Sequence, residues 1–183
     1  MTSPVAGEFE RSATVSVDFS VTDNSGFYYA TASFDNIVWT SSSIDLFFFP
    51  LGSHSFSVRA QDGFVNIASQ TIGFNSIATY DSTISDINRA YKLGWIPTIK
   101  ERDSYLKRIG QAVRIEKIIV KVIEGFPNGS KREKRVERFE KRLDRLLAIV
   151  FLKDLEKSYN KKQISRQAYS LIKEDILWLL GTQ

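Results

Sequence analysis

The sequence contains no cysteine and a single histidine among its 183 residues. The absence of cysteine excludes disulfides, thiolate metal sites and cysteine nucleophiles. The histidine, His54, cannot form a metal site without carboxylate ligands, and no serine or aspartate stands at the spacing of a catalytic partner. Apolar runs are short: the longest, Ile44 to Leu51, contains Asp45 and falls well below the roughly 18 residues of a membrane span. We therefore expect no membrane span.

Basic residues are nearly absent from the first part of the chain. Residues 1–79 contain two basic and seven acidic side chains, a net charge of −5, whereas residues 80–183 contain 23 basic and 14 acidic ones, a net charge of +9. A basic half can indicate an anionic partner. Acidic residues are interspersed throughout this half, however, which is typical of a solvated helical surface. Both interpretations stay open at this point.

The hydrophobic pattern changes near residues 74–84. Before this stretch, apolar residues alternate with Ser, Thr and Asp, which predicts strands. After it, apolar residues recur every three or four positions among dense charge, which predicts helices. The sequence therefore predicts two domains: an all-β domain over residues 1–76 and an all-α domain over residues 77–183.

Alternation and turn residues predict six or seven short strands in the first domain. Valine and phenylalanine occupy every second position of residues 13–21, and Ile44, Leu46 and Phe48 alternate in the same way. Clusters of Asp, Asn, Ser and Gly separate these runs. Short strands at intervals of about 8–12 residues are typical of a β-sandwich, which would bury its aromatic side chains between two sheets.

Four segments of this domain carry the motifs of a known family: Ala32–Asn36, Ile44–Leu46, Leu51–Phe56 and Arg59–Asn66. They resemble the immunoglobulin-like modules of bacterial secreted proteins, whose pattern is an "lDG" turn, then an "lxxGxHxfxvxAxDxxGN" strand and turn, then a final strand. The resemblance covers most of residues 3–76 and implies an Ig-like sandwich in which His54 is structural. Val65 departs from the pattern, because glycine usually stands before Asn66.

Two sets of residues in this domain are candidates for ligand binding. Asp18, Asp23 and Asp62 lie in turns and offer oxygen ligands for Ca²⁺, but we favour turn capping and predict neither a metal site nor a cofactor. The aromatic side chains of Tyr28, Tyr29 and Trp39 offer a stacking platform for a sugar ring. The alternative for these three is packing within the sheets.

About four helices with short loops are predicted for the second domain, which is typical of an antiparallel bundle. The first begins at Thr79 or Asp81 and ends at Leu93–Gly94. The second spans about residues 99–124, and its apolar face broadens toward its end, which indicates burial on more than one side. The fourth begins at the cap residue Ser165. The third spans about residues 131–159, with a core stripe of Val136, Phe139, Leu143, Leu146, Leu147, Val150 and Leu155.

Capping and packing residues of this domain also match a family. They lie in Leu93–Ile96, in Ser104–Ile109 with Ala112, in Leu147, Ala148, Phe151, Leu152 and Leu155, and in Lys162–Ser165 followed by Ala168, Leu171, Ile172 and Asp175. They resemble FIMAH, a small helical module at the C-terminal ends of bacterial secreted and cell-surface enzymes. The resemblance covers roughly residues 80–180 and implies an accessory role without catalytic residues. Between about residues 115 and 142 a long charged stretch replaces the short connection of that family.

The charged stretch is the candidate for binding an anion. Residues 131–142 hold seven basic and three acidic side chains. Teichoic acid, envelope polysaccharide or another anionic polymer would bind there in a salt-dependent way. Phe139 is the only aromatic residue of this stretch and belongs to the core stripe, so stacking recognition of nucleic acid is not expected. The candidate residues are Lys131, Arg132, Lys134, Arg135, Arg138 and Arg142.

Motifs of catalysis are missing. The sequence has no nucleophile elbow, no glycine-rich phosphate loop and no HExxH motif, and we expect Asp144, Asp154 and Asp175 to be solvated on charged helical faces. We therefore predict no enzymatic activity. The preferred hypothesis is a non-catalytic C-terminal accessory module pair of a bacterial secreted or cell-surface protein.

In this hypothesis the sandwich is a spacer or stabilising domain, and the helical domain packs on it or attaches the protein to the envelope or to an oligomer. Its partners would be upstream domains of the parent protein. A bare methionine precedes what reads as mid-protein sequence, so we expect an extracellular location with the signal sequence further upstream. The alternatives are a carbohydrate-binding module of a secreted enzyme, and a module that binds an anionic polymer through residues 131–142.

Overall fold

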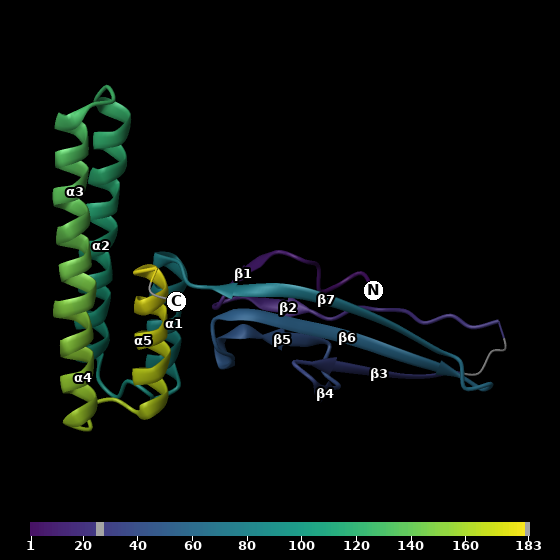
Figure 1. Cartoon of the computed structure of the whole chain (residues 1–183). Helices are drawn as coiled ribbons and strands as arrows, with labels where there is room; N and C mark the ends of the chain where they lie inside the picture. The colour runs from purple at the N-terminus through teal and green to yellow at the C-terminus, as the bar shows by residue number, and fades with distance from the viewer. Residues whose placement is uncertain (25–27, 182–183) are drawn as a thin grey trace. The chain divides into compact units, whose positions relative to one another are not determined.

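A computed structural model describes residues 1–24 and 28–181 of the chain, with only the backbone described for Tyr28. The chain divides into two compact units, Met1–Ile77 and Ala78–Gln183. The first consists of strands and the second of helices, as the change of hydrophobic period predicts (Figure 1). The last strand ends at Ile77 and the first helix begins at Tyr80, so only Ala78 and Thr79 join them.

Two sheets form in the described part of the first unit. Five strands are ordered β1-β7-β6-β3-β4, and the strands β2 and β5 pair separately. Strand β1 runs parallel to β7, and the remaining neighbours are antiparallel. The strands are β1 Glu8–Glu10, β2 Thr14–Ser16, β3 Tyr28–Phe34, β4 Ile37–Trp39, β5 Ser43–Asp45, β6 Gly52–Asp62 and β7 Ile67–Ile77.

Alternate side chains of these strands build an aromatic core. On β6, His54, Phe56 and Val58 are buried at every second position. The ring of Phe34 is near the centre, with T-shaped contacts to Trp39 at 5.5 Å and Phe49 at 4.8 Å between ring centroids. The buried members are Val15, Ala32, Phe34, Ile44, Leu46, Phe56, Val58 and Phe74.

Two predicted strands are shorter than their alternation indicates. Residues 13–21 keep the alternating burial, but only Thr14–Ser16 pairs as a strand, and Asp18 adds a single bridge to Ser3. After β5, a 3₁₀ turn over Leu46–Phe48 replaces the predicted strand continuation. This turn rotates successive side chains by about 120° instead of 180°, so Leu46 and Phe47 are both buried and Phe48 is exposed.

Five α-helices and one π-helical segment form four continuous helical rods in the described part of the second unit, because three of these elements follow one another without a break. The helices are α1 Tyr80–Lys92, α2 Ile99–Gly125, α3 Ser130–Asp144, α4 Leu152–Asn160 and α5 Arg166–Leu179. A π-helical segment, η2 Arg145–Phe151, joins α3 and α4 without a break. Thr79 caps α1 in a reciprocal box with Ser82, and the Ser165 hydroxyl accepts a hydrogen bond from the amide of Ala168 at the start of α5. The predicted caps Thr79 and Ser165 are confirmed.

The π-helical segment changes which residues of this rod reach the core. Leu147, Phe151 and Leu155 are fully buried at intervals of four, whereas Val150 is 37% exposed. A π-helix has more than four residues per turn, so the buried stripe advances by four residues where an α-helix would alternate three and four. The predicted core position of Val150 is therefore wrong, and Phe151 occupies the core instead.

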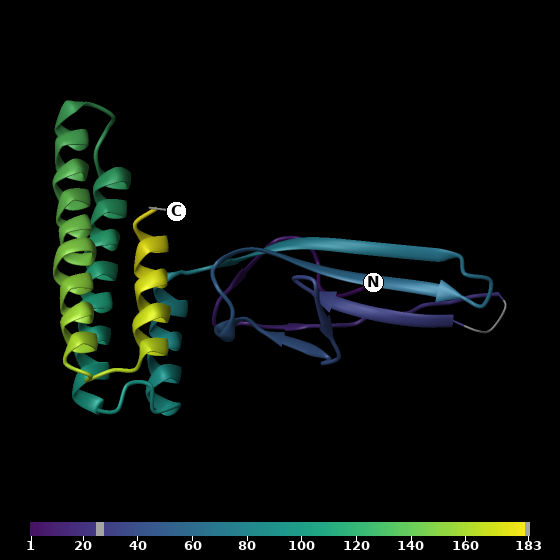
Figure 2. The same ribbon diagram turned by 60° about the horizontal axis from the view of Figure 1, so that its bottom comes forward.

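The four rods differ in length. Helix α2 has 27 residues, whereas α1 has 13 and α5 has 14. Both short helices lie beside the lower part of the long hairpin that α2 forms with the continuous α3–η2–α4 rod (Figures 1 and 2). We call residues 117–143 the hairpin tip. Its side chains Ile118, Val120 and Ile123 are 39%, 46% and 45% exposed, so the expected burial of α2 on more than one side is wrong at this end.

Candidate functional site

A groove of about 600 Å³ lies between α2 and the α3–η2 segment. The apolar side chains Ile115, Ile118, Leu146 and Val150 line it, and Gln111 adds an amide. Three guanidinium groups, of Arg114, Arg142 and Arg145, also line it. Among the described residues of the lining there is no carboxylate, so the groove is strongly basic.

The basic groove arises from the order of charges along α3. At 100° per residue, basic side chains spaced three and four apart gather on one flank of the apolar stripe, and acidic ones gather on the other flank. The arginines of α2 and η2 extend the first flank. We call Arg114, Lys121, Lys131, Arg135, Arg138, Arg142 and Arg145 the basic face. We call Glu116, Glu133, Glu137, Glu140 and Asp144 the acidic face.

The environment of Tyr80 places the acidic face on the side of α1. Burial, together with the negative charges of Glu116 and Asp144, raises the pKa of Tyr80 to about 12. These two carboxylates, one on α2 and one next to η2, therefore face the start of α1. Arg114, Arg142 and Arg145 face the groove on the other flank of the same two rods.

Five of the six predicted anion-binding residues lie along or beside this surface. Arg142 lines the groove, and Lys131, Arg135 and Arg138 continue from it along α3, all with exposed side chains. Lys134 is exposed at the margin of the basic face. The guanidinium carbon of Arg135 lies 4.7 Å from the centroid of the Phe126 ring, which orients this arginine near the loop.

Arg132 has a different position from the other five. Its side chain is half-buried, and its Nη1 donates a hydrogen bond of 3.5 Å to the carbonyl oxygen of Ile123 near the end of α2. This contact joins the two helices of the hairpin. Arg132 therefore has a structural role in the hairpin.

Arg114 and Arg145 belong to the groove but were not among the predicted residues. Arg145 follows Arg138 and Arg142 at the same spacing of three or four, so continuation of the stripe was a usable signal. Arg114 lies on another helix, and only the side-by-side arrangement of α2 and η2 brings it to the groove.

The predicted sugar-binding residues do not form one platform. Trp39 pairs with the buried Ala32, so it faces the core, where its ring contacts Phe34. Tyr29 is 65% exposed, and it lies on the other face of the sheet because it is an odd number of positions from Ala32. Tyr28 begins β3 opposite Asp62, and its side chain lies outside the described part.

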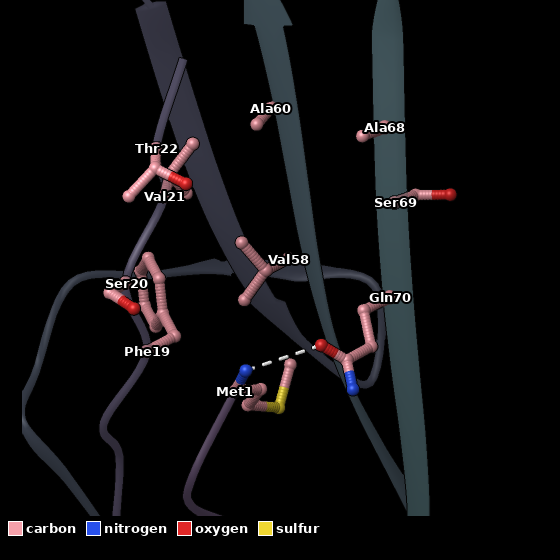
Figure 3. Close-up of a pocket in the computed structure, with 10 residues that line it drawn as sticks. All are labelled: Met1, Phe19, Ser20, Val21, Thr22, Val58, Ala60, Ala68, Ser69 and Gln70. Atoms are coloured by element: carbon pink, nitrogen blue, oxygen red, sulfur yellow. Dashed lines mark hydrogen bonds between the residues drawn. The ribbon is translucent and has the colours of Figure 1, made fainter. Parts of the chain in front are cut away.

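A second hollow, of about 450 Å³, lies in the sheet unit (Figure 3). Phe19, Val21, Val58, Ala60 and Ala68 give it an apolar lining. The amino group of Met1 donates a hydrogen bond of 3.3 Å to Oε1 of Gln70 at its edge. No ionisable side chain lines the described hollow, so it offers only weak means of orienting a ligand.

The histidine and the turn carboxylates make local hydrogen bonds. Both ring nitrogens of the buried His54 have partners, and Asp62 accepts hydrogen bonds from the amides of Phe64 and Asn66, each at 2.8 Å. Hydrogen bonds from Asn66, led by its side-chain amide, hold the pKa of Asp62 below its usual range. In residues 1–24 and 28–181, no cluster of three or more His, Asp or Glu side chains is placed to hold a metal ion.

One predicted surface carboxylate is in the interior. Asp175 on α5 is fully buried, so its expected place on a solvated helical face is wrong. Asp144 is exposed as expected, and Asp154 forms an ion pair with Arg108 of α2. Asp175 was misplaced because its spacing from Leu171, Ile172 and Ile176 puts it on the buried side of α5.

Among the described helices, none combines enough length with enough apolar character to span a bilayer. A comparison of the chain with protein-family models gives no match, and searches of curated proteins and of solved structures give none either.

Proposed function

We propose that the chain is a non-catalytic accessory module pair of a bacterial secreted or cell-surface protein, and that its helical unit attaches the protein to an anionic envelope polymer. The observation that carries the proposal is the convergence of Arg114, Arg142 and Arg145 on one groove without a carboxylate in its described lining. The sheet unit, as an Ig-like sandwich, would act as the spacer. The helical unit, as a FIMAH-like module, would act as the attachment domain.

Arginine suits this task because its guanidinium group binds phosphate or carboxylate oxygens with two parallel hydrogen bonds and is always charged. A single exposed ion pair contributes only about 0–1 kcal/mol, so useful affinity needs several contacts at once. Beyond the groove, Arg138, Arg135 and Lys131 supply a further charge about every 5 Å along α3. A polymer with regularly repeated anionic groups can satisfy this row.

The groove favours a polyol phosphate or an acidic polysaccharide over a nucleic acid. Its lining is aliphatic, with Ile115, Ile118 and Leu146 among the groove residues, and the described lining contains no aromatic ring on which a base could stack. A polyol chain can lie across aliphatic side chains while its charges contact the arginines.

The test is binding of fluorescently labelled polyglycerol phosphate to the triple variant R114Q/R142Q/R145Q. We expect at least tenfold weaker binding at low salt, and a plot of log affinity against log salt whose slope is smaller by about two. The matched control is K92Q/K157Q/K161Q, which removes three exposed charges of the same unit away from the basic face. Equal binding by the two triple variants would reject the groove as the site.

The accessory role is tested on the parent protein. Deletion of this module pair should leave the catalytic or adhesive activity of the upstream domains unchanged and reduce retention on isolated cell walls. Loss of that activity with unchanged retention would contradict the proposal.

A further inference from the structure

The hairpin carries opposite charges on its two flanks. Arg114, Arg142 and Arg145 line the groove on one side, whereas helical spacing puts Glu133, Glu140 and Asp144 on the other flank of α3. Along α3 the same division continues into the hairpin tip, with the basic and acidic faces on opposite sides of the apolar stripe. We infer that copies of the helical unit associate with one another, the basic face of one copy lying on the acidic face of the next.

Exposed apolar side chains accompany both faces. Ile118 and Val150 line the groove beside the basic face. Val120 and Ile123 lie on the flank of α2 that includes Glu116, because they follow it by four and seven residues. All four side chains are at least 37% exposed. Burial of these side chains would provide most of the affinity, because exposed ion pairs contribute little.

The charges determine which faces can meet. A symmetric dimer that used the same face of both copies would place arginines against arginines or glutamates against glutamates, which is unfavourable. Only the unlike pairing brings opposite charges together. It uses a different surface on each partner, so it is a heterologous contact and leaves one basic and one acidic face free at the ends. Assembly of this kind continues beyond a dimer, into open chains unless the rotation between copies closes a ring.

This inference does not depend on the proposed polymer binding. A polymer bound to the basic face would compete with the acidic face of a neighbouring copy, so added polyglycerol phosphate should shorten the chains. Self-association in the absence of polymer tests the inference alone, and polymer binding by variants that do not self-associate tests the proposed function alone.

The experiment uses two variants of the full chain in analytical ultracentrifugation. R114Q/R138Q/R142Q removes charge from the basic face, and E116Q/E133Q/E140Q removes charge from the acidic face. Glu137 is retained because Lys141 already pairs with it, at 2.6 Å. Each variant keeps one competent face, and circular dichroism establishes that each is folded.

We expect the unmodified chain to form species that grow with concentration and shrink in high salt. Each variant alone should stay monomeric, and an equimolar mixture of the two should form a 1:1 dimer that does not grow. The control K92Q/K157Q/K161Q should associate as the unmodified chain does. The inference is overturned if the unmodified chain stays monomeric at millimolar concentration, if it forms a closed dimer insensitive to the glutamate substitutions, or if the mixed variants do not bind each other.

Discussion

The ring nitrogen Nδ1 of His54 lies 2.7 Å from the carboxylate oxygen Oδ2 of Asp35. The second nitrogen, Nε2, lies 2.9 Å from the carbonyl oxygen of Pro50, and the other oxygen of Asp35 accepts a hydrogen bond from the amide of Ser55. The turn after β3, the segment before β6 and β6 itself are thus joined through two side chains. The chain's one histidine is a structural residue in this arrangement.

Replacement of Asp35 by asparagine should destabilise the sheet unit by about 2 kcal/mol, because a buried histidine nitrogen loses its charged partner. The backbone preference is preserved, since Asp35 has a φ of 47° and asparagine tolerates this region as well as aspartate does. Urea unfolding followed by Trp39 fluorescence measures the change. E8Q, at an exposed strand position, is the control and should change stability by less than about 0.5 kcal/mol. Equal stability of the two variants would contradict the role of the pair.

Val65 has a φ of 68°, which is unfavourable for a β-branched residue. Its amide donates a hydrogen bond of 3.2 Å to the carbonyl oxygen of Asp62, so the turn keeps this conformation. V65G should therefore stabilise the sheet unit by about 1 kcal/mol, measured by thermal or urea unfolding. V38G, at an exposed valine of β4, should instead destabilise the sheet unit. Destabilisation by V65G would show that the positive φ is not a source of strain.

The π-helical segment predicts different losses of stability when two neighbouring residues are truncated. F151A should cost about 3–5 kcal/mol, because the side chain is fully buried beside Tyr105, whereas V150A should cost less than about 1 kcal/mol. Chemical unfolding followed by far-UV circular dichroism measures both. A regular α-helix with Val150 in the core would give a larger cost for V150A than is expected here. A cost for V150A close to that of F151A would therefore argue against the π-helical segment.

The pKa of Tyr80 predicts a loss of stability at alkaline pH. Below pH 10 the hydroxyl is protonated in both the folded and the unfolded chain, so it has no effect on the pH dependence. Between about pH 10 and 12 the unfolded tyrosine ionises first, and the free energy of unfolding falls as the pH rises. Y80F should make this fall shallower, measured as the free energy of unfolding at each pH.

Spectroscopic titration of tyrosine at alkaline pH tests the cause of the Tyr80 shift. The double variant E116Q/D144N should lower the pKa of Tyr80 from about 12, because it removes the two carboxylates that oppose ionisation. Burial is the larger cause and should keep the pKa above its ordinary value of 10.0. An unchanged titration would mean that the acidic face does not reach the start of α1.

The sequence predicts the elements better than it predicts their environments. Caps such as Thr79 and Ser165 act through hydrogen bonds within a few residues, so their chemistry is visible locally. The π-helical segment is not visible in this way, because Leu146, Leu147, Val150 and Phe151 allow more than one apolar stripe. The 3₁₀ turn after Asp45 was missed for the same reason.

The candidate groove was also predicted only in part, because some of its residues are visible in the local sequence and others depend on contacts between distant segments. The basic stripe of α3 follows from spacing alone, whereas Arg138 and Arg142 were predicted from the excess of basic residues in residues 131–142. The role of Arg114 depends on a contact between α2 and η2, residues about 30 positions apart along the chain. The sugar-binding hypothesis for Tyr29 and Trp39 lacked the strand register, which places these two residues on opposite faces.

The unequal helix lengths have a consequence for local stability. The ends of α2 and α3 near Gly125 and Ser130 extend beyond α1 and α5, which lie beside the other half of α2 (Figures 1 and 2). Amide hydrogens near the loop should therefore exchange with solvent through small local openings, and those of the lower bundle only through larger ones. A molecule that binds to the basic face or the acidic face would slow amide exchange at the loop end first. A deuterium-labelling profile can therefore locate binding without a prior choice of ligand.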